Sequence, residues 1–158
     1  MKRTFLLSLA FLILIQSTFA QIVLREPLSA RQTYYKIDAI LDPESKTVTG
    51  EMEAYWVNKS TDVVPDIWLH LYMNAFRSNK TTFNKGASLN KADKKSDFGW
   101  INLKSFEDGN GNDLLSRMTY MSPDDNNPDD QTVIRIVPEK PALPGDTVFI
   151  KVKFETKV

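Results

Sequence analysis

The sequence predicts an all-β fold, an antiparallel β-sandwich, on three observations. Apolar and polar residues alternate over short segments, clusters of Gly, Pro, Asn and Asp separate these segments, and no stretch repeats apolar residues at helical spacing. The composition fits one folded domain, because 42% of the 158 residues are hydrophobic and 25% are charged. About seven short strands are therefore expected.

The first twenty residues, 1–20, are expected to be a secretory signal peptide outside the fold. Lys2 and Arg3 precede the apolar run FLLSLAFLILI, and small residues follow as far as Ala20. This run is shorter than the roughly 20 residues that a membrane-spanning helix needs. Cleavage would leave a mildly acidic chain from residue 21 onward. We therefore expect a secreted or periplasmic protein without membrane attachment.

The first two strands are expected at 33–41 and 46–58, joined by turn residues 42–45 (DPES). Both strands alternate clearly, which predicts a β-hairpin with one apolar face. On the second strand that face carries Val48, Gly50, Met52, Ala54 and Trp56.

The remaining strands are shorter or less regular. The segment 66–72 has apolar or aromatic residues on both faces, which predicts an interior strand, and an irregular segment, 73–97, follows it. Further strands are expected at 98–106, 114–121, 131–137 and 146–154. Only four residues follow the last strand, so we expect it to leave an open edge. This predicts an incomplete domain that is marginally stable or self-associating.

The composition excludes several classes of functional site. The absence of cysteine excludes disulfides, thiolate nucleophiles and Cys-ligated metals. His70 is the single histidine, and neither H-E-x-x-H nor G-x-S-x-G occurs, so it is expected to be a hydrogen-bonded structural residue. The 20 basic residues balance 20 acidic ones and are interleaved with polar residues, which argues against nucleic acid as a partner. No catalytic, cofactor-binding or metal-ligating residue is assigned, and no cofactor is expected in this chain.

Three groups of acidic residues have simpler structural explanations. DGNGND at 108–113 begins like a calcium loop but lacks the glycine at the sixth position and the glutamate at the twelfth, so a hairpin turn is expected. The run 124–130 is expected to be a solvated loop. Glu51 and Glu53 share one strand face, whereas glycosidase carboxylates flank a cleft, so they are expected to form an exposed polar face.

The three tryptophans are the remaining candidates for binding. Trp56, Trp68 and Trp100 each lie in an expected strand, which predicts core packing over an aromatic platform. Two other hypotheses stay open beside the one below. The first is a free-standing secreted binding module that uses exposed aromatic residues, and the second is a hydrolase centred on His70.

Five short segments form a pattern in their order and spacing. They are YKIDAILDP at 35–43, KTVTGE at 46–51, YWVNKS at 55–60, IWLHLYMNAF at 67–76 and LPGD at 143–146. This pattern resembles the N-terminal β-domain of the M1 family of zinc aminopeptidases and spans most of the chain. The resemblance implies that residues 21–158 are part of such a domain in an exported metallopeptidase that removes N-terminal residues from peptides.

The family's reactive groups have no counterpart in this chain. Its zinc ligands, in H-E-x-x-H and a distal Glu, and its G-x-M-E-N segment are absent from the sequence. The resemblance therefore implies that zinc belongs to a catalytic domain following in cis, which would be the partner of this domain. The chain as it stands is not expected to be an enzyme.

Overall fold

The computed structural model describes residues 29–86 and 97–158, of which residues 32–158 belong to one compact unit. The strands are β1 (Thr33–Asp42), β2 (Thr47–Val57), β3 (Ile67–His70), β4 (Trp100–Asp108), β5 (Met118–Met121), β6 (Val133–Ile136) and β7 (Thr147–Lys157). The helices are η2 (Tyr72–Phe76), α2 (Thr82–Gly86) and η3 (Leu115–Arg117). The predicted all-β class is confirmed.

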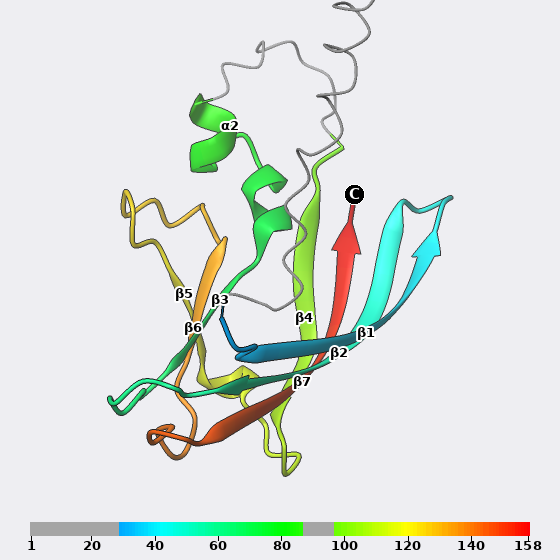
Figure 1. Cartoon of the computed structure of the whole chain (residues 1–158). Helices are drawn as coiled ribbons and strands as arrows, with labels where there is room; N and C mark the ends of the chain where they lie inside the picture. Colours follow the sequence, from blue (N-terminus) through cyan, green and yellow to red (C-terminus); the bar gives the residue numbers. More distant parts are fainter. Residues whose placement is uncertain (1–28, 87–96) are drawn as a thin grey trace, which may run out of the picture. The chain divides into compact units, whose positions relative to one another are not determined.

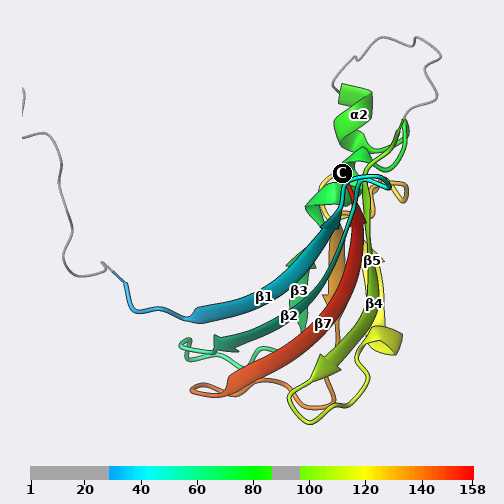
Figure 2. The same ribbon diagram turned by 90° about the vertical axis from the view of Figure 1, so that its right-hand side faces the viewer.

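Two antiparallel sheets contain these strands (Figure 1). The larger sheet has the order β1-β2-β7-β4, and the smaller has the order β3-β6-β5. Figure 2 shows the four long strands curving side by side.

The predicted signal peptide at 1–20 lies outside the described residues. Within 29–86 and 97–158, no helix is long and apolar enough to cross a membrane.

The β1–β2 hairpin forms as the sequence predicts. The Asp42 carboxylate accepts hydrogen bonds from the Glu44 backbone N–H at 2.9 Å and the Ser45 hydroxyl at 2.7 Å. These bonds hold the turn and lower the pKa of Asp42, chiefly through the Ser45 hydroxyl. On β2 the residues of the predicted apolar face are half-buried or buried, with Ala54 the most buried, whereas Thr49, Glu51, Glu53 and Tyr55 between them are exposed.

One apolar core joins the two sheets. The larger sheet contributes Ala54, Phe106, Ile150 and Val152, and the smaller contributes Ile134 and Ile136. Leu71 and Leu114, which lie just outside strands, complete the buried cluster. Burial of these side chains away from water is the main term that stabilises the fold.

Two predicted strand positions are wrong. The strand at the C-terminal end, β7, pairs with β2 on one side and β4 on the other, so it is interior and leaves no open edge. The strand β3, expected in a sheet interior, pairs only with β6 among the described strands. Apolar residues on both faces therefore did not indicate an interior strand here, since Trp68 and His70 remain exposed.

Asp97 links the β1–β2 turn to the end of β7, at the same end of the larger sheet. Its carboxylate forms ion pairs with Lys157, at the end of β7, and with Lys46, at 2.8 Å. Hydrogen bonds from Lys157 and then Lys46 lower the pKa of Asp97 to about 2.

Because this pKa lies below the value of about 3.9 in an unfolded chain, the ionised Asp97 favours the folded state above that pH. The contribution is lost as the pH falls towards about 2. We expect Asp97→Asn to make the urea midpoint less dependent on pH between about 4 and 2. Identical slopes in urea melts of variant and parent would contradict this expectation.

Candidate functional site

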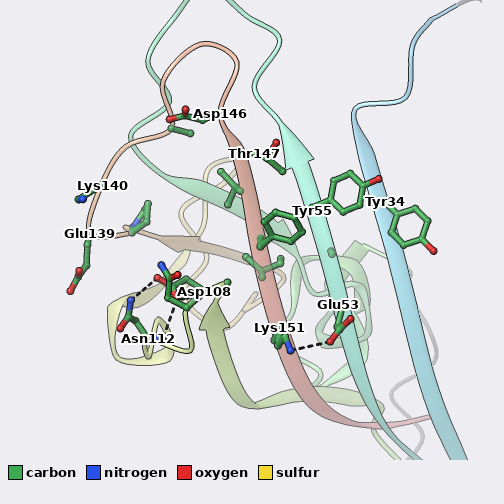
Figure 3. A pocket seen from close by; sticks show the side chains of 18 of the residues that line it. Tyr34, Glu53, Tyr55, Asp108, Asn112, Glu139, Lys140, Asp146, Thr147 and Lys151 are labelled. Atoms are coloured by element: carbon green, nitrogen blue, oxygen red, sulfur yellow. Dashed lines mark hydrogen bonds and ion pairs between the residues drawn. The ribbon is translucent and has the colours of Figure 1, made fainter.

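A trough of about 850 Å³ lies where the larger sheet meets two loops (Figure 3). Strands β1, β2 and β7 supply one wall. The loop after β4 and the segment 138–142 supply the rest. Concave surfaces of this kind are where small ligands usually bind, so the trough is a candidate ligand site.

Three exposed aromatic rings cross the sheet at this trough. Tyr34 on β1 is the register partner of Tyr55 on β2, which in turn is the partner of Phe149 on β7. The tyrosine rings stack with centroids 5.2 Å apart and 14° between planes, and Tyr55 and Phe149 lie 5.5 Å apart. Their exposures are 48%, 36% and 53%, so all three rings are partly open to solvent on an otherwise polar side of the sheet. We call these three residues the aromatic strip.

Gly109 allows the loop after β4 to approach this strip. A Cβ atom at Gly109 would lie 2.9 Å from the Cβ of Phe149, closer than real side chains come. The glycine therefore lets backbone pack directly beside the ring. Any larger residue there would push the loop away from the sheet and widen the trough.

Several charged side chains around the trough pair with other side chains of the protein. Lys151 on β7 forms an ion pair with Glu53 on β2 at 3.1 Å, and its hydrogen bond is the main cause that lowers the pKa of Glu53. Glu139 pairs with Arg117 at 3.2 Å. A trough whose charges pair in this way suits a ligand without net charge.

The segment 108–113 forms a turn, closed by an antiparallel bridge between Glu107 and Asp113, and is part of the trough. The expected hairpin is wrong, because β4 and β5 on either side belong to different sheets. The Asp108 carboxylate accepts bonds from the Asn112 side chain at 2.8 Å and from the backbone N–H groups of Asn110 and Asn112. These bonds lower the pKa of Asp108, with the Asn112 side chain as the largest cause. Gly111 adopts φ of 84°, as such a turn requires. Both carboxylate oxygens of Asp108 thus accept hydrogen bonds from N–H groups of the turn itself and stabilise it.

Glu51 and Asp125 in the other acidic groups also bond to side chains of the protein. Glu51 is exposed and pairs with Lys153 at 2.9 Å, so the expected polar face of Glu51 and Glu53 is confirmed. The run 124–130 is mostly exposed, as expected for a solvated loop, but it is also tied to α2, because Thr82 donates to Asp125 at 2.6 Å. Asn127 in the same run is only 8% exposed. The sequence missed this docking because both partners are polar.

The aromatic candidates named from the sequence lie elsewhere. His70 is exposed, and its ring stacks on Tyr72 with centroids 3.9 Å apart, rather than lying inside the fold. None of the three tryptophans belongs to the core cluster, so the expected core packing is wrong. Trp68 is 47% exposed, and its indole N–H donates to Asp66 at 3.0 Å. Trp56 and Trp68 line a smaller apolar groove of about 300 Å³, which Trp100 does not reach.

Sequence reasoning missed the aromatic strip, although a signal was present. Tyr34 and Tyr55 fall on the polar side of their alternating strands, where a large ring has no core to fill.

Among residues 29–86 and 97–158, no three His, Cys, Asp or Glu side chains gather closely enough to hold a metal ion. No protein-family model matches the chain, and no curated protein matches its sequence.

Proposed function

We propose that this chain is the non-catalytic N-terminal β-domain of a secreted M1-type zinc aminopeptidase, which removes N-terminal residues from peptides. The observation that carries the proposal is where the segments of the resemblance fall. They coincide with residues that shape turns and buried polar contacts of this fold, such as Asp42, Asn58 and Asn74. Such residues fit a scaffold better than a reacting site.

Asn58 and Asn74 illustrate this role, since both are fully buried. The Asn74 amide donates to the Gln131 carbonyl at 2.8 Å and accepts from the Ile101 N–H at 3.0 Å, which ties η2 to the segment before β6 and to β4. The Asn58 carbonyl accepts from Gly145 N–H at 2.7 Å. Two segments of the pattern, YWVNKS and LPGD, therefore meet in space although they lie far apart in the sequence.

In this proposal, zinc and the reacting groups come from the catalytic domain in cis. The test is the reading frame beyond the codon for Val158. An in-frame H-E-x-x-H, with zinc-dependent cleavage of aminoacyl reporters by the whole protein, would support the proposal, whereas residues 1–158 alone should release no product. A stop codon directly after Val158 would contradict it.

The trough favours a second candidate function, a secreted binding module for a neutral ligand. Exposed aromatic rings beside amides and charged side chains suit a polyhydroxylated molecule, whose C–H groups pack on rings while its hydroxyls bond to the surroundings. An uncharged oligosaccharide has this chemistry. The aromatic strip supports this class better than the tryptophans named from the sequence.

We expect Phe149→Ala to weaken binding of a soluble polysaccharide by about three- to tenfold, because one ring of the strip is lost. Affinity electrophoresis in gels containing soluble xylan, starch or β-glucan measures this. Phe83→Ala is the matched control, since Phe83 is 51% exposed and lies on α2, away from the trough. Equal mobility of parent and Phe149→Ala in every gel would reject this function.

A further inference from the structure

Among residues 29–86 and 97–158, no segment covers the long edge of the larger sheet that β1 forms. β1 spans Thr33–Asp42 and has β2 as its single partner among the described strands (Figure 2). All its residues are exposed. The opposite edge, β4, is different, because Asn74 of η2 accepts from the Ile101 N–H and the following turn bonds back to Phe106 and Asp108. Proteins usually shorten, charge or cover an edge of this length.

The hydrogen-bond pattern shows which backbone groups point to the open side. The Val57 N–H donates to the Gln32 carbonyl at 2.8 Å, and Thr33 is the register partner of Trp56. In an antiparallel ladder, hydrogen-bonded and non-hydrogen-bonded pairs alternate. Even-numbered residues of β1 therefore bond to β2. The N–H and C=O groups of the odd-numbered residues, Thr33, Tyr35, Ile37, Ala39 and Leu41, face outward.

The side chains of this edge are apolar on one face and ordered by charge on the other. On the face that carries Ala54 and Ile150 of the core, Tyr35, Ile37 and Leu41 remain 57%, 55% and 58% exposed. The opposite face carries, in chain order, Tyr34, Lys36, Asp38 and Ile40. This order is apolar, positive, negative, apolar. An antiparallel copy of the same strand presents the four residues in reverse, so each charge can face the opposite charge and each apolar residue an apolar one.

We propose that β1 pairs with β1 of a second copy of this chain, antiparallel and with the two-fold axis at Ile37. The two larger sheets then become one continuous eight-stranded sheet. In this register Lys36 lies opposite Asp38 of the second copy, and the symmetry repeats that pair. Tyr34 lies opposite Ile40 in the same way.

The charges select this register over its neighbours. If the two-fold axis moves one residue towards the N-terminus of β1, Lys36 lies opposite Lys36 of the second copy. If it moves one residue the other way, Asp38 lies opposite Asp38 of the second copy. Like charges directly opposite each other destabilise strand pairing, whereas opposite charges stabilise it. The register centred on Ile37 also keeps all five outward-facing residues of each strand hydrogen-bonded.

The groove beside β1 gives the pairing an apolar contact. Thr33 and Tyr35 line this groove together with Trp56 and Trp68. In the proposed register, Leu41 of the second copy lies opposite Thr33, at the mouth of the groove. Leu41 is 58% exposed in the single chain, so this contact removes apolar surface from water in both copies.

Charge exchange at the edge tests the proposal. Protein from cells that express the full chain is examined by sedimentation equilibrium over a range of concentrations, and the parent is expected to dimerise reversibly. Asp38→Lys and Lys36→Asp are each expected to weaken the dimer about tenfold or more, because each creates two like-charge pairs. A mixture of the two variants should dimerise again, since every edge lysine of one copy then meets an edge aspartate of the other.

Controls separate this interface from other causes. Asp38→Lys places a lysine beside Glu51 of β2, so the single chain should remain folded in urea melts. Lys140→Asp, an exposed charge reversal outside β1, should leave the dimer unchanged. Ala39→Pro removes an outward N–H and should abolish dimers without affecting the β2 ladder. A parent that stays monomeric at every soluble concentration overturns the proposal, as does a mixture that fails to restore dimers.

Discussion

Asn58→Asp is expected to lower the free energy of unfolding by about 3 kcal/mol or more at neutral pH, although the two side chains have the same shape. The Asn58 amide nitrogen donates to the Asp62 carbonyl at 2.9 Å and the Ala142 carbonyl at 3.1 Å. Its amide oxygen accepts from the Ser60 hydroxyl at 2.7 Å. The substitution puts a carboxylate oxygen where the donor was, facing two carbonyl oxygens in a fully buried position.

The pH dependence distinguishes this cause from a simple loss of packing. Burial and the two facing carbonyls should raise the pKa of the introduced carboxyl in the folded protein above its unfolded value of about 3.9. The unfolded state then loses its proton first as the pH rises, so the variant loses stability with rising pH until the raised folded pKa is passed. Below about pH 4 the protonated acid can donate to a carbonyl, and the deficit should shrink.

Urea unfolding at several pH values measures this effect, with Asn126→Asp as the matched control. Asn126 is exposed, so its replacement should change the free energy of unfolding by about 0.5 kcal/mol or less. If Asn58→Asp lowered the free energy of unfolding as little as the control, or by an amount independent of pH, the Asn58 amide would not hold the segments of Asp62 and Ala142 together.

The strands were predictable because their signals are local. Alternation over 46–58 and the DPES turn depend on neighbouring residues only, and β1, β2 and their turn appear where the sequence places them. Sheet order is not local. The 146–154 segment reads as an edge strand from its position, yet long-range pairing puts β7 between β2 and β4. The open edge of the larger sheet belongs to β1, which the same alternation describes as half of a hairpin.

The trough was less predictable for a related reason. The aromatic strip exists only because the registers of β1, β2 and β7 align one ring from each strand. The sequence separates Tyr34 from Phe149 by more than a hundred positions, and nothing local indicates that they share a site. Tryptophan content was the more visible signal, but Trp56 and Trp100 lie half-buried and at different places in the fold.

A β-bulge decides which way Phe106 points, and this too depends on pairing. Leu103 of β4 is the register partner of Phe154, whereas Ser105 is the partner of Lys153, so Lys104 is an extra residue in the ladder. Strict alternation from Ile101 would turn Phe106 outward. The bulge shifts the phase by one residue and turns Phe106 into the core, where it is fully buried.

Phe106→Ala is therefore expected to lower the free energy of unfolding by about 3–5 kcal/mol, through lost burial and the cavity left behind. Phe106 is the largest of the fully buried side chains and lies in the cluster that contains both sheets, so little of the space can close around the alanine. A domain of this size is stable by only about 5–15 kcal/mol, and the variant should lose much of that margin. Urea unfolding at a concentration too low for dimers measures the difference.

Phe83→Ala is the matched control for this prediction as well. The same atoms are removed, but Phe83 is 51% exposed and contacts Phe76 on the surface, so about 1 kcal/mol or less is expected. If both variants lost equal stability, the bulge would not turn Phe106 inward as described. A large loss of unfolding free energy for Phe106→Ala alone would show that the fold depends on the inward position of this ring, which results from the bulge at Lys104. Chain alternation by itself would have placed that ring in water.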